Sequence, residues 1–333
     1  MTARFDLVTI GNALVDVLSP VPDSFVEAQA ASHGMVRGSM MLIEQSRATE
    51  LYGAMPPAIE SSGGSAGNTM AGFASFGGKG AYIGKVAKDQ LGEVFSHDMK
   101  AQGVEFTTRP LVDGEATGRC LILVTPDGQR TMNTFLGAAV TLSPSDIDEA
   151  IVSHAQITYL EGYLYDRDHA KAAFIHAAKI AKAAGRKTAL SLSDSFCVDR
   201  HRGDFLDLVK NHIDILFANE QEIISLYQTA TFEEAAALVK ADCDVAVLTR
   251  GAQGSLILAG AQSVEIKAAP VTQLVDTTGA GDQYAAGFLY GYTQGFSLEE
   301  CGRLASLAAA EVISHMGPRP AMAYSDFLDK AAA

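Results

Sequence analysis

Short apolar runs alternate along the chain with longer, alanine-rich amphipathic segments. The short runs are typical of buried strands, and the longer segments have the spacing of helices that pack along one side. The predicted strands lie at residues 6–11, 80–84, 156–160, 187–192, 214–218 and 244–249. The predicted helices lie at residues 65–77, 89–102, 168–184, 231–240, 281–293 and 298–315. This alternation predicts an α/β fold with a mainly parallel sheet covered on both faces.

Two regions interrupt the alternation, at about residues 12–44 and 104–138. Within the second region, residues 117–124 and 130–136 flank the turn sequence Pro126-Asp127-Gly128. An Asp-Gly pair between two such stretches is a strong signal for a β-hairpin. Together the two regions predict a small β-sheet lid over one end of the main sheet.

Length and composition favour a compact enzyme. The chain has 333 residues, of which 48% are hydrophobic and 19% charged, so it can bury a large core. Its length is compatible with two domains, but no linker or repeat divides it, and we expect a single α/β domain over residues 1–333. The net charge of −14 disfavours binding to nucleic acids and anionic membranes. Small molecules are therefore the expected partners, bound by a monomer or a homodimer.

Cysteine usage and the N-terminal sequence predict a cytoplasmic protein. The cysteines are far apart and lack metal-ligand spacing, which is typical of reduced thiols. Near the N-terminus, Asn12 and Asp16 interrupt the apolar stretch that a signal peptide would need. No segment reaches the roughly 18 consecutive apolar residues of a membrane span.

The segment Asp276-Thr277-Thr278-Gly279-Ala280-Gly281-Asp282 carries the strongest chemical signal. Gly279, Ala280 and Gly281 leave the backbone amides unshielded at the start of a predicted helix, where the helix dipole favours an anion. Asp282, in the first turn, is placed to take a proton from an attacking hydroxyl. The same residues would also suit an ordinary helix N-terminus, in which Asp282 only caps free amides.

Two further segments are candidates for binding hydroxyl groups. In Gly63-Gly64-Ser65-Ala66-Gly67-Asn68, the exposed backbone and the Asn68 amide can donate to and accept from a diol. Asn12 and Asp16 follow the first predicted strand, at the edge where parallel sheets bind ligands. A tight turn before a helix and an Asx turn explain the two segments equally well.

Asn219 and Glu222 follow another predicted strand and share one helix face. Their oxygen atoms would suit Mg²⁺ held mainly through water, although a helix cap accounts for the same pair. Thr249, Gly251 and Gly254 form a glycine turn that allows close approach to a nucleotide. Arg130, on the predicted lid, is placed to swing over a phosphate, although a solvated hairpin arginine is the plainer alternative.

Several common motifs are absent from the sequence. The histidines show no metal-ligand spacing, and there is neither a Gly-x-Ser-x-Gly elbow nor a Gly-x-x-x-x-Gly-Lys-Ser/Thr loop. These absences argue against a zinc enzyme, a serine hydrolase of the elbow type and the commonest class of nucleotide-triphosphate binding proteins.

Taken in order, the motifs resemble those of the PfkB (ribokinase-like) carbohydrate kinase family across essentially the whole chain. Residues 276–282 resemble the signature whose final Asp, here Asp282, is the catalytic base and whose preceding amides form an anion hole. Residues 63–68 resemble the family's other signature, and Asn219 with Glu222 resembles its element tied to Mg²⁺ and phosphate. The resemblance implies a three-layer αβα sandwich with a small lid, and ATP and Mg²⁺ as cofactors, with K⁺ as an optional addition.

Within this family, the adenosine kinases are the most similar group. Residues 11–16 are similar to their N-terminal segment, in which the Asn and the Asp bind the nucleoside. Arg130 falls on their lid arginine, and Phe196 on the ring that stacks against the base, with Met132 adding apolar surface. ATP would lie along Asn219, Thr249, Gly251, Gly254 and the segment near His315.

The resulting expectation is a kinase that transfers the γ-phosphoryl group of MgATP to the 5′-hydroxyl of adenosine. The alternative within the fold is a kinase for ribose, fructose or a keto-deoxy sugar acid. A silent ligand sensor would not need Asp282, and a dinucleotide-dependent oxidoreductase would need a Gly-x-Gly-x-x-Gly sequence where Gly11 stands alone.

Overall fold

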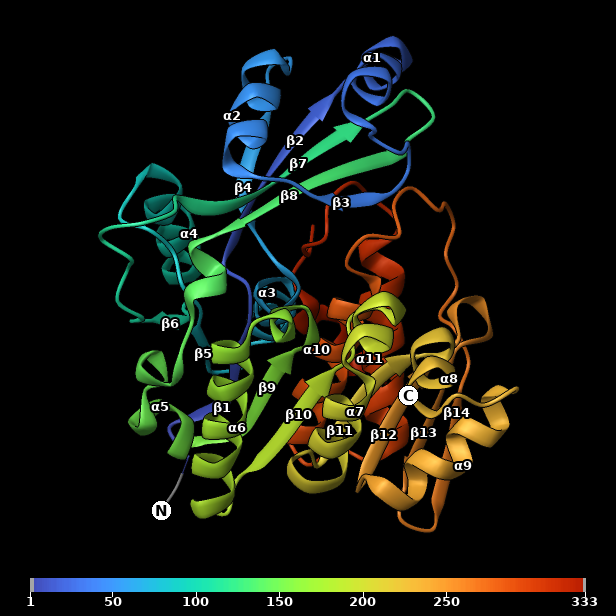
Figure 1. Ribbon diagram of the computed structural model, residues 1–333. Helices are drawn as coiled ribbons and strands as arrows, with labels where there is room; N and C mark the ends of the chain where they lie inside the picture. The colour runs from blue at the N-terminus through green and yellow to red at the C-terminus, as the bar shows by residue number, and fades with distance from the viewer. Residues whose placement is uncertain (1–2, 332–333) are drawn as a thin grey trace.

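The computed structural model describes residues 3–331 and is organised around a nine-stranded sheet. In spatial order the strands are β14 (Gln262–Ile266), β13 (Ser255–Ala259), β12 (Val245–Thr249), β11 (Ile215–Asn219), β10 (Lys187–Ser191), β9 (Ala155–Glu161), β1 (Phe5–Ile10), β5 (Gly80–Ile83) and β6 (Glu105–Phe106). All pairs from β6 to β12 are parallel, and the hairpin β13–β14 adds an antiparallel edge. The parallel strands therefore end at one common edge (Figure 1).

Helices cover both faces of this sheet (Figure 1). One face carries α5 (Glu149–Ser153), α6 (Asp168–Ala183), α7 (Ser195–His212), α8 (Glu220–Tyr227) and α9 (Phe232–Asp242). The other carries α3 (Ser65–Ser75), α4 (Gln90–Ala101), α10 (Ala280–Thr293) and α11 (Leu298–Val312). Side chains along a strand alternate between these two cores: Val8 packs with the first set and Leu7 with the second. The predicted three-layer αβα sandwich is confirmed.

A separate five-stranded sheet stands over the carboxyl edge of the main sheet (Figure 1). Its strands, in spatial order, are β3 (Met40–Leu42), β8 (Arg130–Gly137), β7 (Thr117–Val124), β2 (Leu14–Pro20) and β4 (Ile59–Gly63). The predicted hairpin is present as the antiparallel pair β7–β8, with Gly128 at φ +80° in its turn. The outer face of the small sheet packs against α1 (Asp23–His33) and α2 (Gln45–Ala54). Its inner face is turned toward the main sheet.

The structure adds elements that the sequence pattern did not predict. Helix α7, the hairpin β13–β14 and strand β4 are new, and β4 lies outside both of the regions that interrupt the alternation. Helix α8 begins where the Asn219–Glu222 pair indicated a helix. The described residues end with a short helix α12 (Leu328–Ala331), which follows a loop that packs on α11. Among residues 3–331, no helix combines the length and apolar composition that crossing a membrane requires.

Candidate active site

A cavity of about 980 Å³ lies between the carboxyl edge of the main sheet and the inner face of the small sheet. Such a volume is at the upper end for small-molecule sites and offers room for two ligands. The predicted site residues that line it are Asn12, Asp16, Gly64, Asn68, Met132, Phe196, Asn219, Glu222, Thr249, Gly279, Ala280, Gly281 and Asp282. In the part of the chain that the structure describes, Gly63, Arg130, Gly251, Gly254 and His315 lie outside this lining.

Asp282 lies in the first turn of α10 and is held by two side chains of α3. Its Oδ1 accepts a hydrogen bond from Ser65 Oγ at 2.6 Å, and its Oδ2 accepts one from Asn68 Nδ2 at 3.1 Å. Burial raises the pKa of the Asp282 carboxyl, while these two hydrogen bonds and the charge of Arg319 act in the opposite direction. The carboxylate is thus fixed in direction and is a stronger base than an exposed aspartate.

The glycines before Asp282 shape a backbone nest at the start of α10. Gly279 has φ +79°, and a Cβ atom there would lie 2.7 Å from backbone atoms of Pro318, so glycine is required for two reasons. Gly281 differs, because a Cβ atom there would meet no atom within 4 Å. The backbone N–H groups of Gly281 and Asp282 donate no hydrogen bond to any acceptor within residues 3–331. These amides and the helix dipole can therefore bind an anion that enters the cavity.

The two glycines give a matched pair of variants. Gly279→Ala forces an L side chain into a left-handed conformation against Pro318, and we expect it to lose about 1 to 3 kcal/mol of stability. Gly281→Ala should leave stability unchanged or slightly higher, yet lower kcat about tenfold or more because the methyl group occupies the anion position. Thermal unfolding and steady-state kinetics of both variants test this. Normal turnover by a well-folded Gly281→Ala variant would place the anion elsewhere.

Asp16 occupies the middle of β2 and its carboxylate faces the cavity. The side chain is packed directly on Gly63, where a Cβ atom would lie 2.4 Å from it, which explains the need for glycine at that position. Burial raises the pKa of Asp16 from 3.8 to about 6, opposed by the charges of Arg319 and Arg130. No hydrogen bond from residues 3–331 reaches this carboxylate. A buried carboxylate without donors is well suited to accept from ligand hydroxyls.

Glu161, which the sequence pattern did not single out, organises the neighbouring wall. It ends β9 and accepts hydrogen bonds from Asn12 Nδ2 at 2.7 Å, from the Asn12 amide at 3.3 Å and from the Ala66 amide at 2.8 Å. Burial raises its pKa to about 7, with these hydrogen bonds opposing. The signal in the sequence is an acid directly behind a buried strand. Its function here is to fix Asn12 and the start of α3 relative to each other.

Asn219 and Glu222 form a helix cap and also line the cavity. Asn219 Oδ1 accepts from the Glu222 amide at 2.9 Å, and the Glu222 carboxylate accepts from the Asn219 amide at 2.9 Å and from Nδ2 at 2.6 Å. Burial raises the pKa of Glu222 to about 7, so a nearby cation would favour its ionised form. The helix-cap interpretation of the pair is confirmed, and the binding of Mg²⁺ through water stays a prediction, for which these cavity-lining oxygens are suited.

Residues 3–331 contain no group of three or more His, Cys, Asp or Glu side chains placed to hold a metal on their own. A Mg²⁺ ion beside Asn219 and Glu222 would therefore depend on water and on oxygens of a bound nucleotide. This matches the way in which Mg²⁺ usually accompanies phosphates, since it gives up its own hydration reluctantly.

Arg130 is buried and forms an ion pair with Asp276. The same Asp276 carboxylate accepts from the amides of Thr278 and Gly317, each at 3.0 Å. The Asp276 side chain thus connects strand β8 of the small sheet, the loop before α10 and the loop after α11. In this conformation Arg130 is tied through Asp276 to the loop before α10, and its Nε and Nη1 have no hydrogen-bond partner among residues 3–331.

Of the remaining predicted residues, three lie outside the cavity lining and one, Phe196, lies within it. Gly254 has φ +87° and a Cβ atom there would lie 1.9 Å from the Ile266 carbonyl, so it serves the hairpin β13–β14. Gly251 also has a positive φ, of +55°, and has open space around it. The His315 ring lies 3.1 Å from a Glu311 oxygen and 3.1 Å from the Met316 carbonyl, within the loop that follows α11. Phe196 lines the cavity but is 73% exposed, so its ring is open to a ligand.

Arg319 is a second residue that the sequence pattern did not indicate. It follows α11 in the segment Gly317-Pro318-Arg319-Pro320, and its guanidinium donates to Ser62 Oγ at 2.6 Å and to Asn68 Oδ1 at 3.4 Å. Neither partner is near it in sequence, so only the fold brings the three together.

Comparisons with known proteins agree on one family. The model of the pfkB family carbohydrate kinases matches residues 36–323. A protein from Archaeoglobus fulgidus named as an uncharacterized sugar kinase is 31% identical over 256 residues, which cover 74% of this chain and 96% of that protein.

Two solved structures are similar over nearly the whole length. The adenosine kinase from Sinorhizobium meliloti has 52% identity and a TM-score of 0.91, covering 99% of this chain and 100% of that one. The probable sugar kinase from Rhizobium etli CFN 42 has 50% identity and a TM-score of 0.92, covering 99% of both chains. The fold is therefore ribokinase-like, and the enzyme transfers a phosphoryl group to a hydroxyl. The chain belongs to the pfkB family of carbohydrate kinases.

Proposed function

We propose that the protein transfers the γ-phosphoryl group of ATP to the 5′-hydroxyl of adenosine, giving AMP and ADP. The observation that carries this proposal is the placement of two carboxylates in one cavity: Asp282 beside free backbone amides, and Asp16 without a hydrogen-bond donor. The first suits a base and the second suits the hydroxyl pair of a ribose. The similarity to the Sinorhizobium meliloti enzyme supports the choice of adenosine.

In this proposal, Asp282 takes the proton of the 5′-hydroxyl as the oxygen attacks the γ-phosphorus. Ser65 and Asn68 hold its carboxylate in one orientation, so little reorganisation is needed during the reaction. The amides of Gly281 and Asp282 stabilise the charge on the phosphoryl oxygens as the bond to ADP breaks. The base must be ionised to act, so turnover should fall at low pH.

The nucleotide donor would lie along the ends of β11 and β12. Asn219, Glu222 and Thr249 line the cavity there. A Mg²⁺ ion held through water by the first two would neutralise charge on the phosphates. The nest at the start of α10 would separate this donor side from the acceptor side, where Asn12, Asp16 and Asn68 lie.

The small sheet would act as a lid over the acceptor. Met40, Leu42 and Met132 place apolar side chains in the cavity, and the first two are 42% and 53% exposed. Exposed apolar side chains of this kind can be covered by a purine base. Phe196 offers an aromatic face for the same base. Closure would also exclude water, which competes with the acceptor hydroxyl.

The second candidate is a kinase for a sugar or a sugar acid. Both the Archaeoglobus fulgidus and the Rhizobium etli relatives carry the name of sugar kinase. Among the described residues that line the cavity, Arg200 on α7 is the cation, and it would have to pair with the carboxylate of a sugar acid. Arg200 lies on α7, whereas Asp16 lies on β2 of the small sheet. The two arginines whose charges act on Asp16, Arg130 and Arg319, already contact Asp276, Ser62 and Asn68. A ligand carboxylate would also face the Asp16 carboxylate, so the pocket around Asp16 favours a neutral diol.

A substrate panel tests the proposal. ATP consumption is measured with adenosine, other nucleosides, ribose, fructose and keto-deoxygluconate under identical conditions. We expect kcat/KM for adenosine to exceed that for each sugar about 100-fold or more, because a sugar leaves the apolar lid residues uncovered. Turnover of a sugar with none of adenosine would reject adenosine as the acceptor and leave the kinase assignment intact.

A further inference from the structure

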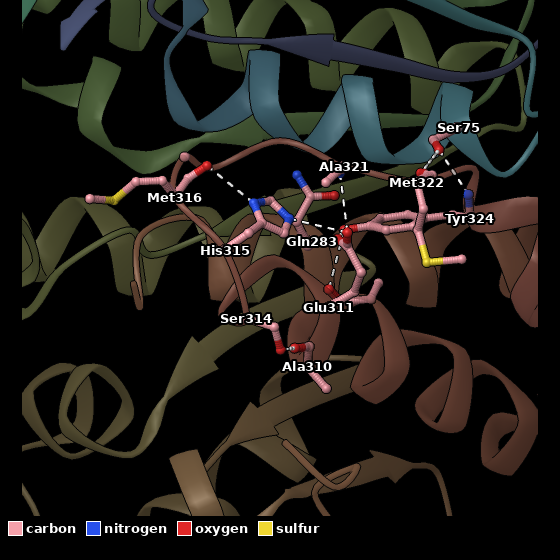
Figure 2. A network of polar contacts seen from close by, with 12 residues as sticks. Ser75, Gln283, Ala310, Glu311, Ser314, His315, Met316, Ala321, Met322 and Tyr324 are labelled. Carbon is pink, nitrogen blue, oxygen red and sulfur yellow. Dashed lines mark hydrogen bonds and ion pairs between the residues drawn. The ribbon is translucent and has the colours of Figure 1, made fainter. Parts of the chain in front are cut away.

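The loop after α11 is pinned to the body of the protein by Glu311. Figure 2 shows this carboxylate at the centre of a polar network. One oxygen lies 3.1 Å from His315 Nε2 and accepts from the Ala321 amide at 3.1 Å, and the other accepts from the Tyr324 hydroxyl at 3.0 Å. These contacts close the loop between residues 315 and 321 on itself.

The same loop is fixed to the helix that carries the candidate base. Gln283 is fully buried in α10, and its Nε2 donates both to the Pro318 carbonyl at 2.8 Å and to the Asn68 carbonyl at 3.0 Å. Pro318 in turn packs against Gly279. The residue that follows, Arg319, is therefore placed with precision relative to α3 and α10.

The Arg319 guanidinium reaches between the small sheet and α3. Its Nη1 donates to Ser62 Oγ at 2.6 Å, and Ser62 donates through the same oxygen to Asp98 at 2.9 Å. Its Nε donates to Asn68 Oδ1 at 3.4 Å. The third nitrogen, Nη2, is buried and has no partner among residues 3–331. Burial of a cation with an unsatisfied donor is costly, so a purely structural cross-link is a poor explanation.

The contact with Asn68 sets the direction of that side-chain amide. An amide has one accepting oxygen and one donating nitrogen. With Oδ1 turned toward Arg319, Nδ2 faces Asp282, to which it donates at 3.1 Å. The reverse orientation would set a donor against Arg319 and an acceptor against the carboxylate. Arg319 thus selects the one orientation of Asn68 that supports the base.

Arg319 also sets the electrostatics at the acceptor end of the cavity. Its positive charge lowers the pKa of both Asp16 and Asp282, against the effect of their burial. The other titratable groups that interact with Asp282 come from several elements and are Asp16 on β2, Tyr159 and Glu161 on β9, and Tyr163 just beyond β9. The two tyrosines are neutral at ordinary pH, since burial raises the pKa of each, so the negative charge near Asp282 that Arg319 offsets is that of Asp16 and Glu161.

We propose that Arg319 is a positioning residue for phosphoryl transfer, which holds Asn68 in the orientation that serves Asp282 and places a positive charge near the Asp282 carboxylate. This inference rests on the proposed function in one respect, that Asp282 is the base. The inference gives Arg319 a role in the reaction although its side chain does not line the cavity. Arg319 lies in the loop after α11, 37 positions beyond Asp282 in the sequence.

The test compares Arg319→Met and Arg319→Lys with the wild type, using the acceptor that the wild type phosphorylates best. For Arg319→Met we expect kcat to fall about tenfold or more with KM for ATP nearly unchanged. The acid limb of its kcat profile should move about half a pH unit or more toward higher pH, because the positive charge is gone. Arg319→Lys keeps the charge but not the fork of donors, so its acid limb should stay in place while kcat falls.

Coupling to Asn68 separates positioning from general stability. In an Asn68→Ala background, Arg319→Met should change kcat less than about threefold, because its target is absent. Arg303 lies on α11, outside the cavity lining. Arg303→Met therefore serves as the control for the general effect of replacing an arginine with methionine. Equal losses in both backgrounds, or an acid limb that does not move, would overturn the inference. If Arg319→Met does not fold, an unchanged kcat in Arg319→Lys would overturn it as well.

Asp282→Asn is measured in parallel. An active Asp282→Asn variant would refute the proposed base, whereas an inactive one beside a normal Arg319→Met would refute only the role of Arg319.

Discussion

Replacing Asp282 with asparagine is expected to lower kcat about 10²- to 10⁴-fold, the range that a positioned general base contributes. Asparagine has nearly the same shape and keeps one oxygen for Ser65 or Asn68, so the fold should be retained. It cannot take the proton of the attacking hydroxyl. The measurement is single-turnover phosphoryl transfer, with the dissociation constant of ATP determined by calorimetry.

The dissociation constant of ATP should remain within a few-fold of the wild-type value, because the donor side of the cavity is formed by other elements. Asp282→Glu is an informative companion, since it restores a carboxylate but displaces it from Ser65 and Asn68. We expect that variant to regain only part of the activity, because position matters as well as basicity. Near-normal turnover by Asp282→Asn would mean that another group removes the proton.

Asp16→Asn is expected to have two opposite effects. It should lower kcat/KM for adenosine about 10²-fold, mainly through KM, because the hydroxyl pair is bound in the ground state as well as in the transition state. It should also stabilise the free protein by roughly 1 to 3 kcal/mol at neutral pH. The second effect follows from the pKa of Asp16, which burial raises from 3.8 to about 6.

The sign of this stability effect can be worked out directly. Because the folded pKa lies above the unfolded value, the favourable contribution of Asp16 is complete below pH 3.8 and is lost as the pH rises to about 6. Above that pH the ionised, buried carboxylate costs free energy that asparagine does not. Urea unfolding of both proteins should therefore show a difference at pH 7.5 that shrinks toward pH 4.

An acceptor lacking the hydroxyl pair provides the matched control. With 2′,3′-dideoxyadenosine, wild type and Asp16→Asn should have similar kcat/KM values, because the contact in question is missing from both reactions. A loss of equal size with both acceptors would show that Asp16 does not bind the hydroxyls.

The sequence pattern predicted the frame of the molecule well because the relevant signals are local. The short apolar runs became β1, β5, β9, β10, β11 and β12, each within two residues of its predicted bounds. The glycine-rich sequences before α3 and α10 also lie where predicted. A backbone position with positive φ, such as Gly279, favours glycine, so it can be recognised from the local sequence.

The elements that escaped prediction lack such local signals. Helix α7 is mostly polar and kinks at His201, so its apolar spacing is weak. The turn at Gly251 and Gly254 resembles a ligand loop, but the physical demand on Gly254 comes from the carbonyl of Ile266 across a hairpin. A glycine needed for packing and a glycine needed for a ligand look the same in a sequence.

The site residues that escaped prediction depend on contacts between distant positions. Glu161 acts on Asn12, 149 positions away, and Arg319 acts on Asn68, 251 positions away. Arg130 illustrates the converse, because its place on β8 was predicted, yet its ion pair with Asp276 was not. The partner of a charged residue is set by the fold, and nothing near Arg130 in the sequence indicates Asp276.

The contact between Pro318 and Gly279 has a consequence for biosynthesis. On the ribosome the chain emerges from its N-terminus, and the first sheet strands and the glycine turn before α3 are available early. The nest at α10 still lacks its supporting loop until residues 317–319 have left the exit tunnel. A nascent chain that already binds nucleotide would therefore be unable to consume it, and catalytic competence would arrive only at the end of translation of this region.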